Sequence, residues 1–446
     1  MRLGAQVRDP ITEAEATRLA REIYRLEAAA RALPGEYDDN FHLTTREGRA
    51  FVLKVMHPAR EPSFIDLQGR AMVHLAEHAP QLPLPRLLPN PNGEPFSEIT
   101  RADGSKRLVW LLSYLEGTVL AKVRPHTFEL LRDLGRFLGQ MDATLQSFEH
   151  PAAHRELKWD SSRAVWIRKH IPEIRAAARR ALVEKFLALY EAEVLSRLPR
   201  LRRSVIYGDA NDYNVLVSDP WPQPRKIAGM IDFGDMHHGL TVSEAAVAAA
   251  YAILGKSHPL GAAAAVVAGY HRAFPLEEEE VAAVFPLMAA RLAVSVTNSA
   301  HRKKGRPDDA YVTVSEEPAW NALELLAKVH PRFAHSTLRA ACGMTPVPKA
   351  ERIQCWLKAN GKAAAPVLDV DLRTEGTLVF DLGVSSLLVG ADPAASETRA
   401  LTETIFSRMK RAGVRVGVGR YNEARPLYRS PLFGSVDHPV AERRTI

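Results

Sequence analysis

The sequence predicts an α+β fold in two lobes: a small lobe with an antiparallel sheet, followed by a larger, mostly helical lobe. Short apolar runs rich in branched residues mark strands in the first 117 residues. Apolar residues at helical spacing predominate between 125 and 330. A pair of short strands, at 215–217 and 227–231, interrupts these helices. This order differs from the regular alternation of strand and helix in a parallel βαβ enzyme.

In the small lobe, the run at 50–55 reads as a strand that contains a single lysine, Lys54. Lys54 is either a phosphate ligand or a charge that faces water on an edge strand. Residues 33–43 read as a turn between strands, and Gly35 alone does not make a glycine-rich loop. A helix is expected at 64–75, and Pro83 and Pro85 then favour an extended segment. A further strand and a linker are expected at 109–117.

The large lobe is predicted from helical periodicity. Apolar residues at 128, 131, 134, 138, 141 and 145 fall on one helix face and predict an amphipathic helix from 125 to 148. The same reasoning predicts further helices within 161–199, 241–255, 260–273, 277–300 and 317–330. These helices flank the strand pair on both sides, so the strand pair belongs to the helical lobe.

The strand pair carries the residues with the clearest chemistry. Asp209 follows Tyr207 and Gly208, Asn214 stands five positions later, and Asp232 precedes Phe-Gly after the second strand. Two strands joined by the turn at 218–225 would bring Asn214 and Asp232 to adjacent strand ends. Phosphoryl transfer requires a positioned acceptor, metal ions and a clamped nucleotide, and this set supplies oxygen and amide groups for that purpose. The alternative is that Asp and Asn next to Gly simply form loops.

With these motifs, the chain resembles the aminoglycoside phosphotransferase family, whose members have a bilobal protein-kinase-like fold, and within it the hydroxylysine kinase branch. The resemblance covers roughly residues 10 to 335 and includes Ile231-Asp-Phe-Gly-Asp235 and the alanine-rich run 243–251. Family members usually have His-Gly-Asp where this chain has Tyr207-Gly-Asp. The departure puts the role of that histidine in doubt and leaves Asp209 in place.

The resemblance implies a role for each matching residue. Asp209 would orient the acceptor hydroxyl, and Asn214 and Asp232 would hold Mg²⁺. ATP or GTP would be bound by Lys54, Gln68 and the backbone of three linker residues, Ser113, Tyr114 and Leu115. Gln68 stands where a kinase usually has a Glu, so either it forms a neutral hydrogen bond to Lys54 or the pairing is absent.

Candidates for substrate contact are acidic residues and a histidine near Asp209. A cationic amino alcohol would favour carboxylates there, and Asp212, Asp235 and Asp160 are available, with His237 beside them. Each acid could instead cap a helix or stabilise a loop.

Composition and net charge limit the classes of partner expected for this chain. The net charge is +7, from 59 Lys plus Arg against 52 Asp plus Glu, and the basic clusters at 175–180, 197–203 and 301–306 are short. We therefore expect neither a nucleic-acid partner nor a membrane span, and a cytoplasmic location. The two cysteines, Cys342 and Cys355, lack metal-ligand spacing.

The predicted domains are 1–117, 118–342 and 343–446. The third has the composition of a small separate domain, and its acids at 369, 371 and 381 are more typical of exposed strand faces than of a metal site. Residues 433–446 resemble the start of the zinc peptidase-like segment of bacterial fusion proteins that continue into a pyridoxal-phosphate aminotransferase-like region. This resemblance implies a fused or associated PLP-dependent lyase or aminotransferase partner.

Three functions remain at this stage. The first is Mg²⁺-dependent phosphorylation of a hydroxylysine-like amino alcohol or hydroxylated amino acid by ATP or GTP. The second is a pseudokinase-like scaffold module in a larger PLP-lyase fusion, which Tyr207 and Gln68 favour. The third is an aminoglycoside antibiotic phosphotransferase, for which a more acidic acceptor pocket is expected than this basic chain indicates.

Overall fold

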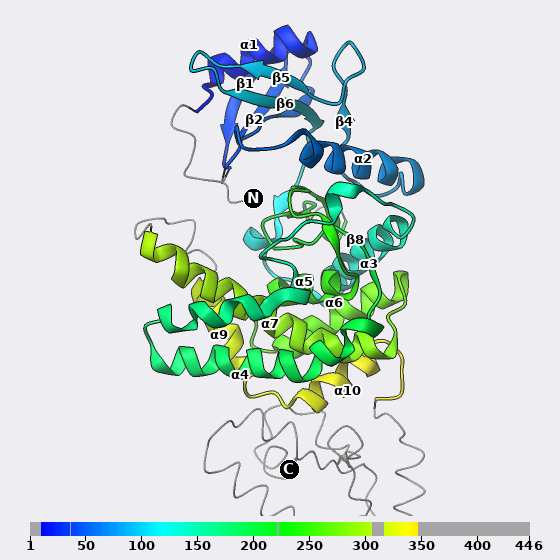
Figure 1. The fold of residues 1–446 in the computed structure, drawn as a ribbon. Coiled ribbons are helices and arrows are strands. Elements are labelled where there is room, and N and C mark those ends of the chain that lie inside the picture. Colours follow the sequence, from blue (N-terminus) through cyan, green and yellow to red (C-terminus); the bar gives the residue numbers. More distant parts are fainter. Residues whose placement is uncertain (1–9, 36, 221–222, 306–315, 347–446) are drawn as a thin grey trace, which may run out of the picture. The chain divides into compact units, whose positions relative to one another are not determined.

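The computed structural model of the protein describes residues 10–35, 37–220, 223–305 and 316–346. The chain divides into two compact units (Figure 1). The first contains the residues up to Leu157 together with the segment from Arg202 to Glu244, and the second contains Lys158 to Leu201 and the chain from Ala245 onward. The amino-terminal sheet and the strand pair with Asp209 thus share one unit, although the sequence analysis placed them in different lobes. The predicted elements beyond 346 lie outside the described residues.

An antiparallel sheet forms the amino-terminal part of the first unit. Its strands follow the order β1-β2-β3-β6-β4, and β5 also pairs with β6. The two central strands, β3 and β6, carry the most apolar sequences. The strands are β1 (Ala28–Leu33), β2 (Asp39–Thr45), β3 (Ala50–Val55), β4 (Leu87–Leu88), β5 (Ser97–Thr100) and β6 (Lys106–Ser113).

Helices lie against this sheet. The α1 helix (Glu13–Tyr24) begins at Thr12, whose hydroxyl caps the amide of Glu15, and it buries Leu19 in the core between helix and sheet. The α2 helix (Pro62–His78) runs past β4, where a Cβ on Gly69 would lie 3.2 Å from a methyl of Leu87. A larger residue at 69 would therefore push the helix away from the sheet.

The rest of the first unit consists of α3 and two short strand pairs. The α3 helix (Phe128–Leu145) is capped by the Thr127 hydroxyl and packs against β8 and β10. The short elements around it are β7 (Thr118–Val119), η1 (Leu120–Lys122), η2 (Pro151–Ala153), β8 (Arg203–Ile206), β9 (Val215–Val217), β10 (Ile227–Met230) and β11 (His237–Leu240).

Helices make up the described part of the second unit, and α7 (Glu278–Gly305) packs against most of the others. By length and composition, Glu278–Lys303 would suffice to cross a membrane, yet 89% of its apolar window is buried inside the protein, as in the core helix of a globular domain. The remaining elements are η3 (Ser161–Glu173), α4 (Ala177–Glu193), η4 (Leu195–Arg200), α6 (Pro259–Ala273), α9 (Glu316–Leu326) and α10 (Pro331–Ala341), with α5 (Val242–Ala252) leading in from the first unit.

Most predicted elements match the structure, one is wrong in part, and one helix was not predicted. The strand at 50–55 has the predicted bounds, and α2, α3, α5, α6, α7 and α9 lie where helices were expected. The helical stretch 161–199 is wrong in part, because η3 is a 3-10 helix with Pro172 inside and non-helical dihedrals at Arg163. The α10 helix was not predicted.

A buried arginine fastens the sheet from inside. Arg107 on β6 is 1% exposed, and its guanidinium donates to the carbonyl of Met56 at 2.7 Å and to that of Val55 at 3.0 Å. It also forms an ion pair with Asp39 at 2.7 Å. These contacts hold the start of β2, the end of β3 and β6 together, because one guanidinium binds a carboxylate on β2 and two carbonyls at the end of β3.

Replacing Arg107 by Met is expected to lower the free energy of unfolding by about 2–3 kcal/mol, since it removes the guanidinium from the Asp39 carboxylate and from two carbonyls. Urea unfolding, followed by circular dichroism, measures this change in the free energy of unfolding. The control is Lys106→Met on the same strand, whose exposed pair with Glu98 is worth less than about 0.5 kcal/mol. Equal losses in both variants would contradict the structural role of Arg107.

Candidate active site

Two antiparallel strand pairs place the candidate catalytic residues. The β9 and β10 strands pair with Val215 opposite Met230, and β8 and β11 pair with Ile206 opposite His237. The loop from 207 to 214 therefore connects β8 to β9, and the loop from 231 to 236 connects β10 to β11. The amide of Ile231 donates to the carbonyl of Asn214 at 3.0 Å, which continues the β9–β10 pairing by one bond. Asn214 and the residue before Asp232 are thus neighbours, as the sequence predicted.

Asp209 and Asn214 are bonded directly. The Asn214 side-chain nitrogen donates to Asp209 Oδ2 at 3.0 Å and to the Asp209 carbonyl at 3.1 Å. Asn211 donates to the same carboxylate oxygen at 2.7 Å. The Asn214 nitrogen is used in this way, and the side-chain oxygen has no hydrogen bond among the described residues, so it can act as an acceptor. The loop thus holds the half-buried Asp209 carboxylate in one orientation.

Asp232 has an unusual backbone conformation. Its φ is +63°, a region that non-glycine residues seldom adopt and that Asp tolerates better than most. One carboxylate oxygen accepts from the amide of Gly234 at 3.1 Å, which closes a local turn. The side chain is exposed, so the turn directs a carboxylate to solvent beside Asn214. Strained dihedrals of this kind are typical of functional sites.

Tyr207 links the loop at 207–214 to the loop at 231–236. Its hydroxyl donates to the carbonyl of Ile231, and its ring meets the ring of Phe233 edge-on at a centroid distance of 5.2 Å. Burial raises the pKa of Tyr207 well above its ordinary value, and the negative charges of Asp209 and Asp232 raise it further, so the hydroxyl keeps its proton. Tyr207 is therefore a positioning residue, which links the loop of Asp209 to the loop of Asp232 by its hydroxyl.

The backbone at position 208 leaves no room for a side chain. Its φ is +83°, and a Cβ there would lie 2.8 Å from the carbonyl oxygen of Asp235. The amide of Gly208 donates at 2.8 Å to the carboxylate of Glu244, which is fully buried at the start of α5. Glu244 thus anchors the residue immediately before Asp209. Sequence reasoning missed this anchor, although Glu244 lies in the alanine-rich run that supported the resemblance.

Arg155 supports the second loop. Its guanidinium donates to the carbonyl of Gly234 at 2.6 Å and to that of Met236 at 2.7 Å, and it lies 5.0 Å from the centre of the Phe64 ring. Burial lowers the pKa of Arg155, and the charge of Asp235 opposes that shift. No local motif marked Arg155, because its partners are about eighty positions away.

The expected nucleotide residues lie on the amino-terminal sheet. Lys54 is half-buried on β3, opposite Trp110 in register, with its amine 5.8 Å from the centre of the indole. Because β3 pairs with both β2 and β6, the edge-strand alternative for Lys54 is wrong. Gln68 is buried on α2 and donates to the carbonyl of Phe64 at 3.0 Å. Of the two alternatives for Gln68, this bond favours the absence of a pairing with Lys54.

The linker after β6 offers fewer free groups than expected. The amide of Ser113 donates to the carbonyl of Arg86 at 2.9 Å, and that of Tyr114 donates to the carbonyl of Ala50 at 3.3 Å. The hydroxyl of Ser113 accepts from the amide of Arg86. Of the three linker amides, only that of Leu115 has no hydrogen bond among the described residues, which makes it the candidate donor to a base.

The candidate substrate residues have different surroundings. Asp212 and Asp235 are half-buried, one in each loop. His237 is 3% exposed, and its ring packs against Gly208 and Gly239, which favours a packing role over substrate contact. Asp160 belongs to the second unit and caps η3, accepting from the amide of Ser162 at 2.8 Å. The helix-cap alternative for Asp160 is therefore confirmed.

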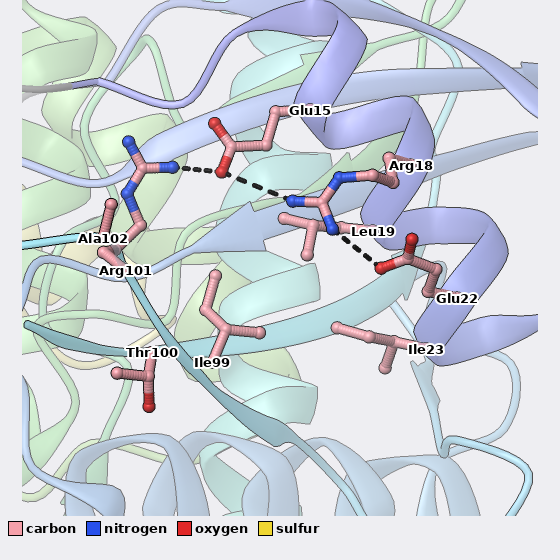
Figure 2. A pocket seen from close by; sticks show the side chains of 9 residues that line it. All are labelled: Glu15, Arg18, Leu19, Glu22, Ile23, Ile99, Thr100, Arg101 and Ala102. Carbon is pink, nitrogen blue, oxygen red and sulfur yellow. Dashed lines mark hydrogen bonds and ion pairs between the residues drawn. The ribbon is translucent and has the colours of Figure 1, made fainter. Parts of the chain in front are cut away.

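A groove elsewhere on the first unit is occupied by paired charges. Figure 2 shows its side chains, which come from α1, from β5 and from the turn after β5. Glu15 bonds Arg101 and also faces Arg18 at 3.8 Å, and Arg18 bonds Glu22 at 2.9 Å. The volume is about 480 Å³, but none of the candidate site residues lines it.

Comparison with known proteins identifies the family. The model described as the phosphotransferase enzyme family matches residues 29–284, more than half of the chain and all of the site from Lys54 to Glu244. The chain belongs to the phosphotransferase enzyme family. It is 30% identical to the hydroxylysine kinase of Danio rerio over 309 residues, which cover 67% of this chain and 86% of that protein. The hydroxylysine kinase of Mus musculus is 26% identical over 344 residues, 72% of this chain and 91% of that protein.

Solved structures confirm the α+β protein-kinase-like fold. The amicoumacin kinase hAmiN, in complex with AMP-PNP, Ca²⁺ and Ami, matches with a TM-score of 0.53 at 13% identity, covering 70% of this chain and 93% of that one. A microcompartment-associated aminopropanol kinase matches with a TM-score of 0.52 at 19% identity, covering 74% and 98%. From the family match and the curated relatives, we class this family member as a phosphotransferase with a hydroxyl group as acceptor.

Removing the Tyr207 hydroxyl by Tyr207→Phe is expected to lower kcat about tenfold with little change in the KM for nucleotide, because the link to the Asp232 loop is lost. Tyr207→His should restore part of the rate, since an imidazole N–H can also donate to a carbonyl. Steady-state kinetics of the three proteins measures this.

The matched control is Tyr24→Phe. The Tyr24 hydroxyl also donates to a carbonyl, that of Val109 at 3.1 Å, but on the amino-terminal sheet. Tyr24→Phe should leave kcat unchanged. Equal kcat in Tyr207→Phe and the parent enzyme would refute the positioning role.

Proposed function

We propose that this phosphotransferase moves the γ-phosphoryl group of ATP or GTP to the hydroxyl of a hydroxylysine-like amino alcohol or hydroxylated amino acid. The observation that carries the proposal is the bonded set of Asp209, Asn214 and the Ile231–Asp232 backbone. The names of the curated relatives support the acceptor class. In this proposal Asp209 orients the acceptor hydroxyl and accepts its proton as the phosphoryl group leaves the nucleotide.

The loops suit a hard divalent cation, which we propose to be Mg²⁺. Mg²⁺ prefers carboxylate and carbonyl oxygens. The Asn214 oxygen is left free by the bonds of its nitrogen, and Asp232 commits only one carboxylate oxygen, to Gly234. When bound, the ion would neutralise negative charge on the phosphates. Asn214 and Asp232 are the residues that would hold it.

The nucleotide would be bound by the amino-terminal sheet of the same unit. Lys54 is proposed to reach the phosphates from the central strand β3, and the free amide of Leu115 to face the base. Gln68, Ser113 and Tyr114 would then shape the site rather than bind the nucleotide through their amides, because those groups are already bonded.

For the acceptor, Asp212 and Asp235 are the proposed contacts to a cationic amine. They lie in the two loops that also contain Asp209 and Asp232, so an amine held between them would place a neighbouring hydroxyl near Asp209. The burial of His237 and the capping role of Asp160 remove them from this proposal. A PLP-dependent partner that eliminates the new phosphate remains part of it, and the segment on which that expectation rests lies outside the described residues.

The role of Asp209 is tested by Asp209→Asn. Loss of the base should reduce kcat by about 10²–10⁴-fold while nucleotide binding is retained, because the nucleotide residues are untouched. Initial rates and nucleotide titration measure both quantities. Asp219→Asn, in the exposed turn after β9, is the matched control and should be fully active. An Asp209→Asn enzyme as fast as the parent would remove the assignment.

The acceptor class is tested by a transfer screen with both ATP and GTP over amino alcohols, hydroxylated amino acids and aminoglycosides. Saturable turnover is expected with hydroxylysine-like compounds, since the relatives at 26–30% identity are hydroxylysine kinases. Turnover of kanamycin-like sugars alone would favour an antibiotic phosphotransferase. Nucleotide binding without turnover of any acceptor would favour the scaffold interpretation.

A further inference from the structure

Two helices of the second unit bring together three side chains that can bind a metal. His170 and Glu173 lie on η3, and His301 lies near the end of α7. Their ligand atoms, two imidazole nitrogens and a carboxylate oxygen, all lie within 4.8 Å of one another. His170 Nδ1 is 3.3 Å from Glu173 Oε1, and His301 Nδ1 is 2.9 Å from Glu173 Oε2.

The local structure explains the convergence. A 3-10 helix has three residues per turn, so side chains at i and i+3 lie directly above one another. His170 and Glu173 have this spacing and therefore share one face of η3. The edge of Trp166 packs against the His170 ring at a centroid distance of 5.6 Å, and the His301 ring lies 4.0 Å from that of His170. The packing of η3 on α7 supplies the third group.

We propose that His170, Glu173 and His301 form a binding site for a divalent transition metal of the zinc class. Two histidines and one glutamate are a known Zn²⁺ ligand set, with Zn–N and Zn–O distances of about 2.0–2.2 Å. Ligands at tetrahedral angles and those bond lengths are separated by about 3.3 Å. His170 Nδ1 lies at this distance from Glu173 Oε1, and one ligand atom from each of the three residues lies within 4.8 Å of the other two, so small side-chain rotations would complete the set. The fourth position would be taken by water, because His301 is 47% exposed at its side chain.

One cation near the set is paired elsewhere. The closest lysine in sequence, Lys303, forms an ion pair with Glu316 at 2.5 Å, and Ser299 donates to the same carboxylate at 2.7 Å. Glu316 therefore offsets the positive charge of Lys303. The Glu173 carboxylate bridges the two imidazoles by hydrogen bonds.

A metal here would fasten η3 to α7. The η3 segment has the poorer hydrogen-bond geometry of a 3-10 helix, contains Pro172, and departs from helical dihedrals at Arg163, where φ is −120°. A metal-mediated cross-link to the core helix α7 would therefore stabilise η3. Metal binding to the folded state alone also stabilises it by mass action. The site is separate from the phosphotransfer residues, so this inference does not rest on the proposed function.

The test uses the full chain without an affinity tag, stripped of metal with a chelator and free of nucleotide. Titration with Co²⁺ should give the visible absorption of a tetrahedral ion at one equivalent, and Zn²⁺ should displace it and raise the thermal midpoint. Glu173→Gln and His301→Ala should each weaken Zn²⁺ binding by about tenfold or more. His301 is exposed, so its replacement is expected to leave the fold intact, and circular dichroism of the metal-free variants verifies this.

The matched control is His74→Ala. His74 and His78 also form a close imidazole pair, stacked at 4.2 Å on α2, but without a carboxylate between the rings. His74→Ala should bind Zn²⁺ as the parent does. The proposal is overturned if the parent takes up no Co²⁺ or Zn²⁺, if His301→Ala binds as tightly as the parent, or if the loss appears in His74→Ala instead.

Discussion

Asn214 is the residue on which the geometry of the site depends. Its side chain holds the carboxylate of Asp209 at 3.0 Å, and its main-chain carbonyl holds the amide of Ile231 at 3.0 Å, one residue before Asp232. One residue thus contacts both loops, and the β9–β10 pairing and the Tyr207 hydroxyl add further links between them. The amide side chain suits this position because it donates and accepts at once, so it can hold Asp209 and still offer an oxygen to a cation. An aspartate here would repel Asp209.

Tyr207 meets the structural requirements of the position at which family members usually have histidine. What the position needs is a donor that reaches the Ile231 carbonyl and a flat body that packs on Phe233, and a phenol meets both needs. A phenol also cannot become cationic, so a tyrosine places no titratable positive charge next to Asp209 and Asp232. The buried Glu244 then acts on the next residue through the amide of Gly208. The two loops are therefore held by the neutral Tyr207 hydroxyl, by the buried Glu244 carboxylate and by the Arg155 guanidinium.

The sequence predicted what short-range patterns encode. The strand 50–55 was correct because branched apolar residues surround one lysine, and the meeting of Asn214 and Asp232 followed from two strands and a turn. The features that sequence analysis missed depend on contacts between residues far apart in the chain. Arg155 and Arg107 act through carbonyls roughly eighty and fifty positions away, and no local spacing marks a residue that binds main-chain oxygens. The segment 161–173 was misread because its apolar residues fit either helix type, whereas Pro172 favours the shorter turn.

The surroundings of the candidate substrate residues restrict which of them can contact an acceptor. Of the four candidate residues, Asp160 is occupied by a helix cap and His237 by packing, so the acids that remain are in the two catalytic loops. The charge of Asp235 also opposes the lowering of the Arg155 pKa by burial, and Arg155 itself holds the loop through Gly234 and Met236. A cationic acceptor bound there would thus contact the same loops that orient Asp209 and carry Asp232. Recognition of the amine and alignment of the hydroxyl would then be a single event, and an acceptor that lacked the amine would lose rate as well as affinity.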